Sequence, residues 1–209
     1  MRDVLRQAWP FALAAVLNAL QLRLNVLVLE RLSGDNGGGL YAAASRFVEA
    51  GRLVPSAMFG ALFPALSSLA AQPQAMHRTF IIAARLLLAF GVAFAIAMTL
   101  FGGGLIRLTY DPRGVAFAGA APVLTVLAWS LVPSLLRGGA TLYLYGQGRE
   151  HLVNTITVVA LIAQAIVGWL LIMQWGALGG AITVIIIEGG TVLCLWYALR
   201  ARTLTLGLS

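Results

Sequence analysis

Long apolar runs separated by short polar stretches make up most of the 209-residue sequence. Each run is long enough for the roughly 20 residues that an α-helix needs to cross a hydrocarbon core of about 30 Å. The pattern therefore predicts an all-α, polytopic membrane protein, with residues 1–209 forming a single six-helix transmembrane bundle. The expected helices cover residues 9–29, 40–69, 80–106, 115–136 with an alternative end at Tyr145, 152–173 and 177–199.

The composition supports a membrane protein. The chain is 60% hydrophobic and only 10% charged, and its mean hydropathy is +0.91, which excludes an ordinary soluble domain. The first apolar run carries Arg23 and Asn25, continues beyond the length of a signal-peptide core and lacks a small-residue cleavage pattern. We therefore expect a transmembrane helix there and not a cleaved signal peptide.

The distribution of arginines predicts the orientation. An even number of helices places both termini on one side, and positive residues are retained on the cytoplasmic side. That side would carry Arg2, Arg6, Arg78, Arg149, Arg200 and Arg202, and the other side Arg31, Arg107 and Arg113. Both termini are therefore predicted to be cytoplasmic. The net charge of the chain is +7. Membrane topology and contact with anionic lipid headgroups account for the part of this charge that the arginines in the loops contribute, so no nucleic-acid partner is expected.

Several kinds of chemistry are missing from the sequence. All 14 basic residues are arginine, so residues 102–104, a run of three glycines, lack the lysine of a phosphate-binding loop. His77 and His151 are far apart and have no carboxylate at ligand spacing, and the single cysteine, Cys194, cannot form an internal disulfide. Residues 34–39, Gly-Asp-Asn-Gly-Gly-Gly, are typical of a turn. We expect no enzyme activity, no metal and no cofactor.

The second predicted helix contains three charges, Arg46, Glu49 and Arg52. On insertion scales they would together cost about 8–10 kcal/mol if they faced lipid, so we expect them to face protein or water. At 100° per residue they fall on one stripe of the helix with smaller or polar residues. Those residues are Ser56, Gly60 and Ser67. Pro55 and Pro64 predict kinks beside this stripe, as in a cavity wall that can bend.

Two more groups of polar residues lie inside predicted helices. Three amides share one face of the first helix because offsets of three and seven residues return to nearly the same angle. They are Asn18, Gln21 and Asn25. In the last helix Glu188 needs a partner or a proton, and Arg52 and Arg137 are the candidate partners.

These charges have two interpretations. They can pair with one another and hold helices together, with no substrate involved. Alternatively, the surplus of Arg46, Arg52 and Arg137 over Glu49 and Glu188 leaves a guanidinium free in a cavity, where it suits bidentate binding of phosphate or carboxylate. The sequence leaves both open.

Two segments resemble the polysaccharide flippases of the multidrug, oligosaccharidyl-lipid and polysaccharide exporter (MOP) superfamily. The first has the family's Gly-x-Tyr start at Gly39–Tyr41, its Arg-x-x-Glu core at Arg46–Glu49 and its late Pro-x-Leu-Ser at Pro64–Ser67. The second, residues 143–190, is similar to the closing hairpin, with a Gly-Ala-x-Gly turn at Gly176–Gly179 and an acidic residue within the last helix. The resemblance extends from Pro10 to Arg200.

The chain departs from the family pattern in two respects. Asn25 stands where family members usually carry an acidic residue, which weighs against a proton or cation role at that position. Family transporters also have twelve or more helices in two halves, so this chain resembles the C-terminal half alone, as a half or a fragment of a longer transporter. A missing N-terminal half, a second chain or a second copy would then cover its polar stripe.

The resemblance implies translocation of a polyprenyl-pyrophosphate-linked saccharide across the bacterial inner membrane, in polysaccharide or cell-envelope biosynthesis, by alternating access. The predicted substrate-binding residues are Arg46, Arg52, Arg137, Asn18, Gln21 and Asn25. Glu49 and Glu188 are the predicted coupling or structural acids. Half of a cation-coupled multidrug exporter, a non-transporting membrane subunit and a truncated gene product are the alternatives.

Overall fold

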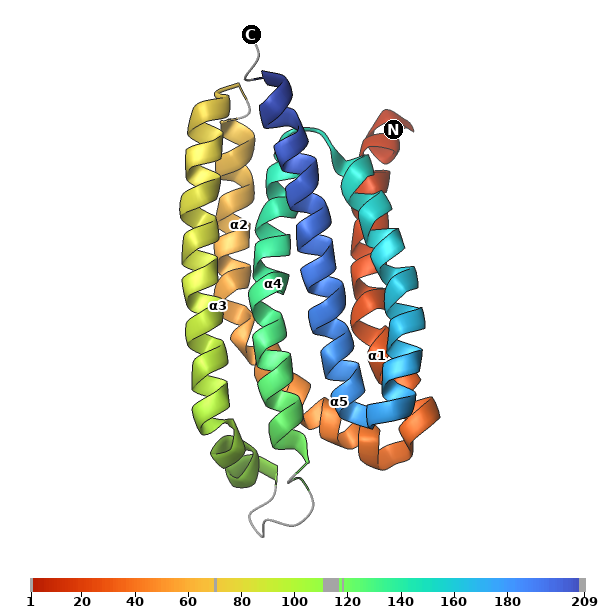
Figure 1. Ribbon diagram of the computed structural model, residues 1–209. Helices are drawn as coiled ribbons and strands as arrows, with labels where there is room; N and C mark the ends of the chain where they lie inside the picture. Colours follow the sequence, from red (N-terminus) through yellow and green to blue (C-terminus); the bar gives the residue numbers. More distant parts are fainter. Residues whose placement is uncertain (1, 70, 111–116, 118, 207–209) are drawn as a thin grey trace.

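The computed structural model is a bundle of long helices with no strand in the described part of the chain (Figure 1). The helices are α1 (Arg2–Gly51), α2 (Leu53–Ser68), α3 (Pro73–Tyr110), α4 (Ala120–Gly146) and α5 (Glu150–Leu206). The structure describes residues 2–69, 71–110, 117 and 119–206, without the side chains of 2–15, 18, 22, 33–36 and 200–206.

Five helices make six passes because α5 folds back on itself at Gly176, whose backbone is not helical (φ 54°, ψ −130°). Similarly, α1 runs along the bundle, turns at its far end and begins a second pass that α2 completes (Figure 1). The predicted all-α, six-helix fold is confirmed. Three segments are long and apolar enough to cross a membrane, namely α3, α4 and residues 150–199 of α5.

The start of α1 and the end of α5 lie at the same end of the bundle (Figure 1). The α2–α3 and α4–α5 connections are at that end too, whereas α1 turns and α5 folds back at the opposite end. This arrangement agrees with the two sides inferred from the arginines. That the first of these ends is cytoplasmic stays a prediction.

Two segments differ from the sequence prediction. Residues 34–39 were expected to form a turn between the first two helices. α1 does turn back at this end of the bundle (Figure 1), but the backbone stays helical through these residues, because local propensity is a weak preference that packing overrides. The predicted second helix is divided at Arg52. Pro55 has no N–H to donate to the carbonyl of Gly51, so the hydrogen-bond ladder is interrupted there. Pro64 stays inside α2.

The core of the bundle is organised around α4, which contacts all four other helices. The larger hydrophobic cluster packs Leu124 and Leu131 of α4 against Leu29 of α1, Leu87 of α3 and Ile172 of α5. A smaller cluster lies toward the end that holds the termini. Because α4 is surrounded by other helices, polar side chains on it must face the interior of the protein.

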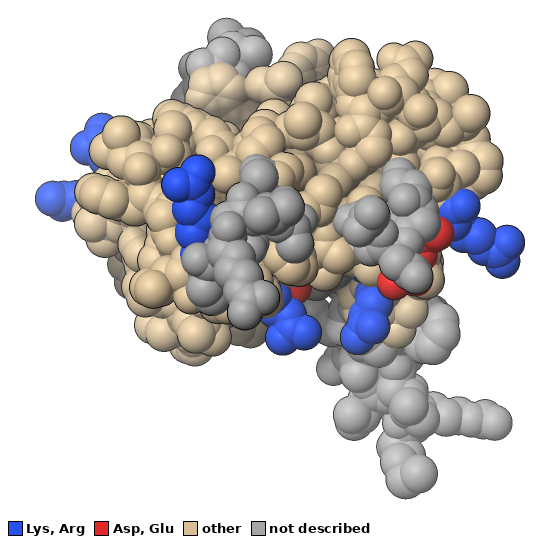
Figure 2. Space-filling model, turned by 90° about the horizontal axis from the view of Figure 1, so that it is seen from below, with Lys and Arg blue, Asp and Glu red and all other residues tan. Residues whose placement is uncertain are grey.

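The outer surface of the bundle is largely apolar. On α3, for example, Leu86, Leu100 and Phe101 are exposed. Seen from the end where α1 turns, most of the surface is neither basic nor acidic, and charged side chains of both signs meet beside a hollow (Figure 2). Exposed large apolar side chains along the helices fit contact with lipid and not with water.

The fold-back of α5 requires glycine at two positions. Gly176 has positive φ, which costs a residue with a side chain about 1–2 kcal/mol. A Cβ atom at Gly179 would collide with the backbone carbonyl of Leu171. We predict that Gly179→Ala lowers the free energy of unfolding by about 1–3 kcal/mol, as overpacking does, seen as a lower melting temperature in detergent micelles.

The matched control for this prediction is Gly104→Ala on α3. A Cβ atom at Gly104 would meet nothing within 4 Å apart from its chain neighbours and the backbone of its own helix. Since alanine favours a helix over glycine, this variant should melt at or above the native temperature. Equal melting temperatures for the two variants would contradict the role assigned to the fold-back.

Candidate functional site

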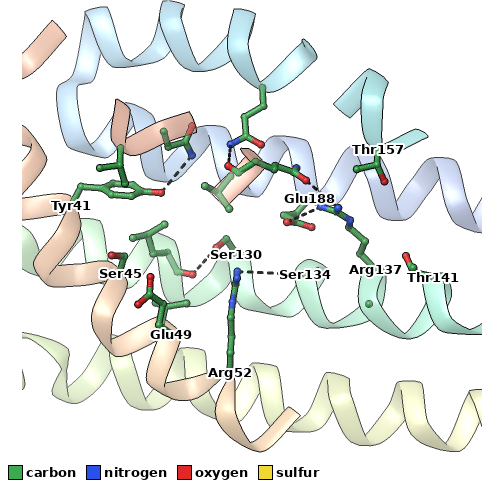
Figure 3. A pocket seen from close by; sticks show the side chains of 18 of the residues that line it. Tyr41, Ser45, Glu49, Arg52, Ser130, Ser134, Arg137, Thr141, Thr157 and Glu188 are labelled. Atoms are coloured by element: carbon green, nitrogen blue, oxygen red, sulfur yellow. Dashed lines mark hydrogen bonds and ion pairs between the residues drawn. The ribbon is translucent and has the colours of Figure 1, made fainter. Parts of the chain in front are cut away.

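A cavity of about 350 Å³ lies between α1, α4 and α5 (Figure 3). Most of its lining residues are polar, whereas the exterior of the bundle is largely apolar. The polar lining residues are Gln21, Asn25, Tyr41, Ser45, Glu49, Arg52, Ser130, Ser134, Arg137, Thr141, Tyr145, Thr157, Gln164 and Glu188. It is the natural candidate for a functional site, because a concave space with convergent polar groups is what ligand sites share.

One face of α4 forms a continuous polar wall of this cavity. Ser130, Ser134, Arg137, Thr141 and Tyr145 all line it, and their spacing of three or four residues places them on one side of a helix. At 1.5 Å per residue this wall is about 22 Å long, most of the thickness of a hydrocarbon core. Apart from Arg137, these residues were not predicted from the sequence, although their spacing is visible in it.

Arg137 and Glu188 form an ion pair in the lining of the cavity. Nη1 of Arg137 donates to Oε1 of Glu188 at 3.1 Å, and the two side chains are only 10% and 11% exposed. Nη2 of Arg137 donates to the side-chain oxygen of Gln21 at 3.0 Å. Nε2 of Gln164 donates to the backbone carbonyl of Gln21 at 2.9 Å. The network thus joins α4 to both passes of α5 and to α1.

Of the two partners that the sequence offers for Glu188, the structure selects Arg137. Arg52 instead donates from Nη2 to the hydroxyl of Ser134 at 3.4 Å. Its Nε has no hydrogen-bond partner among the described residues although the atom is buried. Arg52 follows directly after α1, where the broken ladder lets its side chain reach toward α4 (Figure 3).

Two acceptor atoms in the cavity also lack a partner within the described chain: Oδ1 of Asn25 and Oε2 of Glu188. The Asn25 amide donates to the hydroxyl of Tyr41 at 3.5 Å and to the carbonyl of Gly180 at 3.4 Å. Its Oδ1 therefore stays free to accept. Both residues are at least nine-tenths buried, so each free oxygen is withdrawn from bulk water.

Glu49 lines the cavity but is exposed. It forms no ion pair with Arg46 or Arg52 in the described structure. Of the two interpretations that the sequence leaves open, pairing with a neighbouring arginine is therefore not observed for Glu49. Glu49 and Arg52 mark the mouth of the cavity, because they are the charged lining residues that solvent reaches.

Arg46 lies exposed and outside the cavity lining. The other stripe residues, Ser56, Gly60 and Ser67, are exposed as well. Only Glu49 and Arg52 of the predicted stripe therefore line the cavity, whereas its other members face the surface of this bundle. The side chain of Asn18 lies outside the described residues. Whether these residues bind a substrate stays a prediction.

The described residues contain no group of three or more His, Cys, Asp or Glu side chains that could hold a metal ion. His77 contacts the ring of Tyr143 edge-on at 6.3 Å between ring centroids, and Cys194 is exposed. The cavity chemistry is therefore that of two guanidinium groups, two carboxylates, amides and hydroxyls, which bind and orient polar groups.

We predict that Glu188→Gln lowers the free energy of unfolding by about 3 kcal/mol, because removing one partner of a buried ion pair leaves the other charge uncompensated. The double variant Arg137→Met/Glu188→Leu should recover most of this loss. Thermal unfolding in detergent micelles measures both effects.

The control is Glu49→Gln, which removes an exposed carboxylate that makes no ion pair in the described structure. We expect it to change stability by less than about 1 kcal/mol. If Glu188→Gln and Glu49→Gln were equally stable, the ion pair would not hold the helices together.

A family model described as "Polysaccharide biosynthesis protein" matches residues 1–70. This third of the chain covers α1 and α2, and so includes the stripe and Arg52. A comparison with curated proteins finds no match.

Two solved structures share the fold. One is a MOP superfamily transporter from Pyrococcus furiosus, for which a reverse polarity of the binding pocket is described as suggesting a different function. It matches this chain with a TM-score of 0.83 at 18% identity, and the match covers 96% of this chain and 46% of that one. The other is the outward-facing conformation of a multidrug resistance MATE family transporter of the same superfamily, with a TM-score of 0.83 at 18% identity, over 97% of this chain and 47% of that one.

The chain thus spans just under half the length of the two transporters that it matches. The resemblance drawn from the sequence is confirmed: almost the whole chain has the fold of one half of a MOP superfamily transporter, and its first third matches the polysaccharide biosynthesis model.

Proposed function

We propose that this chain forms one half of a transporter that flips a polyprenyl-pyrophosphate-linked saccharide across the bacterial inner membrane, in polysaccharide or cell-envelope biosynthesis. The observation that carries the proposal is the polar cavity with Arg52 at its mouth, in a chain whose first 70 residues match the polysaccharide biosynthesis model. Transport is by alternating access and involves no covalent chemistry, so the chain is not an enzyme.

Arg52 is the best candidate to bind the anionic group of the cargo. Arg137 is already engaged by Glu188 and Gln21, whereas Arg52 makes only a long bond to Ser134 and has a buried Nε to spare. A guanidinium with free donors suits bidentate contact with a phosphate oxygen pair. Arg46, exposed on the adjoining surface, would add positive charge from outside the cavity.

The amides have separate roles in this proposal. Asn25 offers a free acceptor oxygen to sugar hydroxyl groups, and Asn18 would extend the same face of α1. The side-chain oxygen of Gln21 is occupied by Arg137, so Gln21 positions the arginine more readily than it contacts a sugar.

The charges of the cavity support a coupling role for its acids. The lining carries two arginines, Arg52 and Arg137, and two glutamates, Glu49 and Glu188, so its formal charge is zero. An added pyrophosphate would make the cavity strongly negative unless a glutamate takes up a proton or Arg46 contributes its charge. Glu188, with one free oxygen, is our candidate for that proton, and Glu49 stands at the mouth.

The exposed polar stripe requires a cover within the membrane, because charged side chains facing lipid cost several kcal/mol. An N-terminal half encoded with this chain is the first candidate, since the matched transporters are about twice as long. A second chain or a second copy of this chain would serve the same purpose. An open reading frame upstream of Met1 that encodes six more transmembrane helices would support the first candidate.

A second candidate function is half of a cation-coupled multidrug exporter. The likeness to a multidrug resistance MATE family transporter and the exposed Glu49 at the cavity mouth favour it. Binding assays separate the two functions, because a lipid-linked saccharide requires the arginines whereas a cationic dye requires the acidic groups. Binding of neither would leave a non-transporting subunit or a truncated gene product as the interpretation.

We predict that Arg52→Glu abolishes export of surface polysaccharide in the natural host while the protein still inserts into the membrane, because a carboxylate repels the pyrophosphate. Arg52→Lys should retain part of the activity, since it keeps the charge but loses the bidentate geometry. Export is measured on cells, and insertion by the amount of protein in isolated membranes.

Arg85→Glu is the matched control. Arg85 is an exposed arginine on α3, away from the cavity, so the same change of charge should leave export near the native level. Normal export by an inserted Arg52→Glu variant would remove Arg52 from the cargo site.

A further inference from the structure

Three exposed arginines lie on one face of α3. They are Arg78, Arg85 and Arg107, and offsets of 7 and 22 residues return to within about 40° of the starting angle on a helix. None of the three forms an ion pair with another described residue. The opposite face of α3 carries Leu87 and Ala95, which are fully buried. The face with the arginines therefore points away from the bundle.

Apolar side chains occupy this face between Arg85 and Arg107. Ile96 and Leu100, for example, are 46% and 70% exposed, and residues 86–106 contain no charged residue. The offset of 22 residues between the two arginines corresponds to a rise of about 33 Å. The hydrocarbon core of a bilayer is about 30 Å thick. The apolar part of the face thus has the length of one bilayer core.

Other positions of α3 in the membrane fit less well. The apolar run predicted from the sequence, residues 80–106, is about 40 Å long and exceeds the hydrocarbon core. A core that began at Phe80 would place Arg85 about 7.5 Å inside the hydrocarbon, where a charged side chain is costly. It would also end before Phe101, which is 66% exposed. A core between the two arginines avoids both problems.

We propose that hydrocarbon contacts α3 only between Arg85 and Arg107, and that both guanidinium groups lie among the lipid phosphate groups, one in each leaflet. A guanidinium suits bidentate hydrogen bonds to phosphate. Arg78, on the same face, adds attraction to anionic headgroups in the leaflet of Arg85. Residues 73–84, the first part of α3, then extend about 18 Å beyond the hydrocarbon. In this arrangement Arg85 meets lipid and water but not the cargo.

The contacts between α3 and α4 carry this boundary to the candidate site. The two helices lie side by side (Figure 1). Gly139 lies next to Leu87, and the rings of Tyr143 and Phe80 are 4.6 Å apart between centroids. The boundary therefore meets α4 between Gly139 and Tyr143. The polar cavity wall of α4, which ends at Tyr145, thus reaches the headgroup layer at this end, while the rest of it lies at the depth of the hydrocarbon.

Spin labels measure these depths directly. Cys194→Ala first removes the only cysteine. Ile82→Cys and Ile96→Cys then form a matched pair on α3, because the two isoleucines are 50% and 46% exposed. Leu108→Cys and Leu100→Cys, at positions 80% and 70% exposed, test the other boundary. The full chain carries one nitroxide label at a time in vesicles of phosphatidylcholine and phosphatidylglycerol. The probes are oxygen, which partitions into hydrocarbon, and nickel(II) ethylenediaminediacetate, which stays in water.

We expect the ratio of oxygen collisions to nickel collisions to be at least about tenfold higher at position 96 than at position 82, because a polar complex is excluded from hydrocarbon. The same ratio should be higher at position 100 than at position 108. Both differences are expected whichever cargo the complete transporter moves.

Equal ratios at positions 82 and 96 would overturn the boundary at Arg85, and equal ratios at positions 100 and 108 would overturn the boundary at Arg107. A label at position 96 that collides with neither probe would also overturn the proposal, because protein and not lipid would then cover this face. All four positions are exposed, and size-exclusion chromatography checks that each variant folds. If Ile96→Cys fails to fold, the exposed Ala93 takes its place. Loss of export in Arg52→Glu bears on the cargo site and not on these depths, so the two proposals fail separately.

Discussion

The ion pair between Arg137 and Glu188 is the interaction on which the interior of the bundle depends. Neither charge is tolerated alone in a protein surrounded by lipid, so α4 and the second pass of α5 must lie close enough for the two side chains to meet at 3.1 Å. The bond from Arg137 to Gln21 then draws α1 to the same point. One guanidinium thus joins α1, α4 and the second pass of α5, and it forms part of the lining of the cavity.

The position of α4 follows from the same constraint. Its polar face is about 22 Å long and has to be kept out of contact with lipid. This requires that other helices surround α4. A side of α4 about a quarter turn from the polar face carries the apolar residues Leu124 and Leu131, which pack in the main core. α4 therefore contributes to both the main hydrophobic cluster and the polar cavity, so the same helix supplies both stability and the candidate site.

The fold and the central pair could be predicted from the sequence because each rests on a strong local constraint. Hydropathy set the number of passes, and the cost of a buried charge limited Glu188 to two partners. The direction of the stripe could not be predicted: helical angles group Arg46 with Ser56 and Gly60 but do not say which side of the bundle they face. The cavity-lining hydroxyl groups of α4 could not be predicted either, for another reason. A serine such as Ser130 bonds to its own helix, so it hardly disturbs an apolar pattern.

The charged side chains in the interior of this chain and those on its surface differ in how they are accommodated. Inside, the described helices form two hydrophobic clusters and a closed ion pair, as expected of a unit that folds as a whole. Outside, a stripe that carries Arg46 and Glu49 lies exposed in a bundle otherwise suited to lipid. A surface with those charges is stable in a bilayer only against protein or water. The exposed stripe is therefore the surface that the proposed second half would cover, and Glu49 on this stripe also lines the cavity.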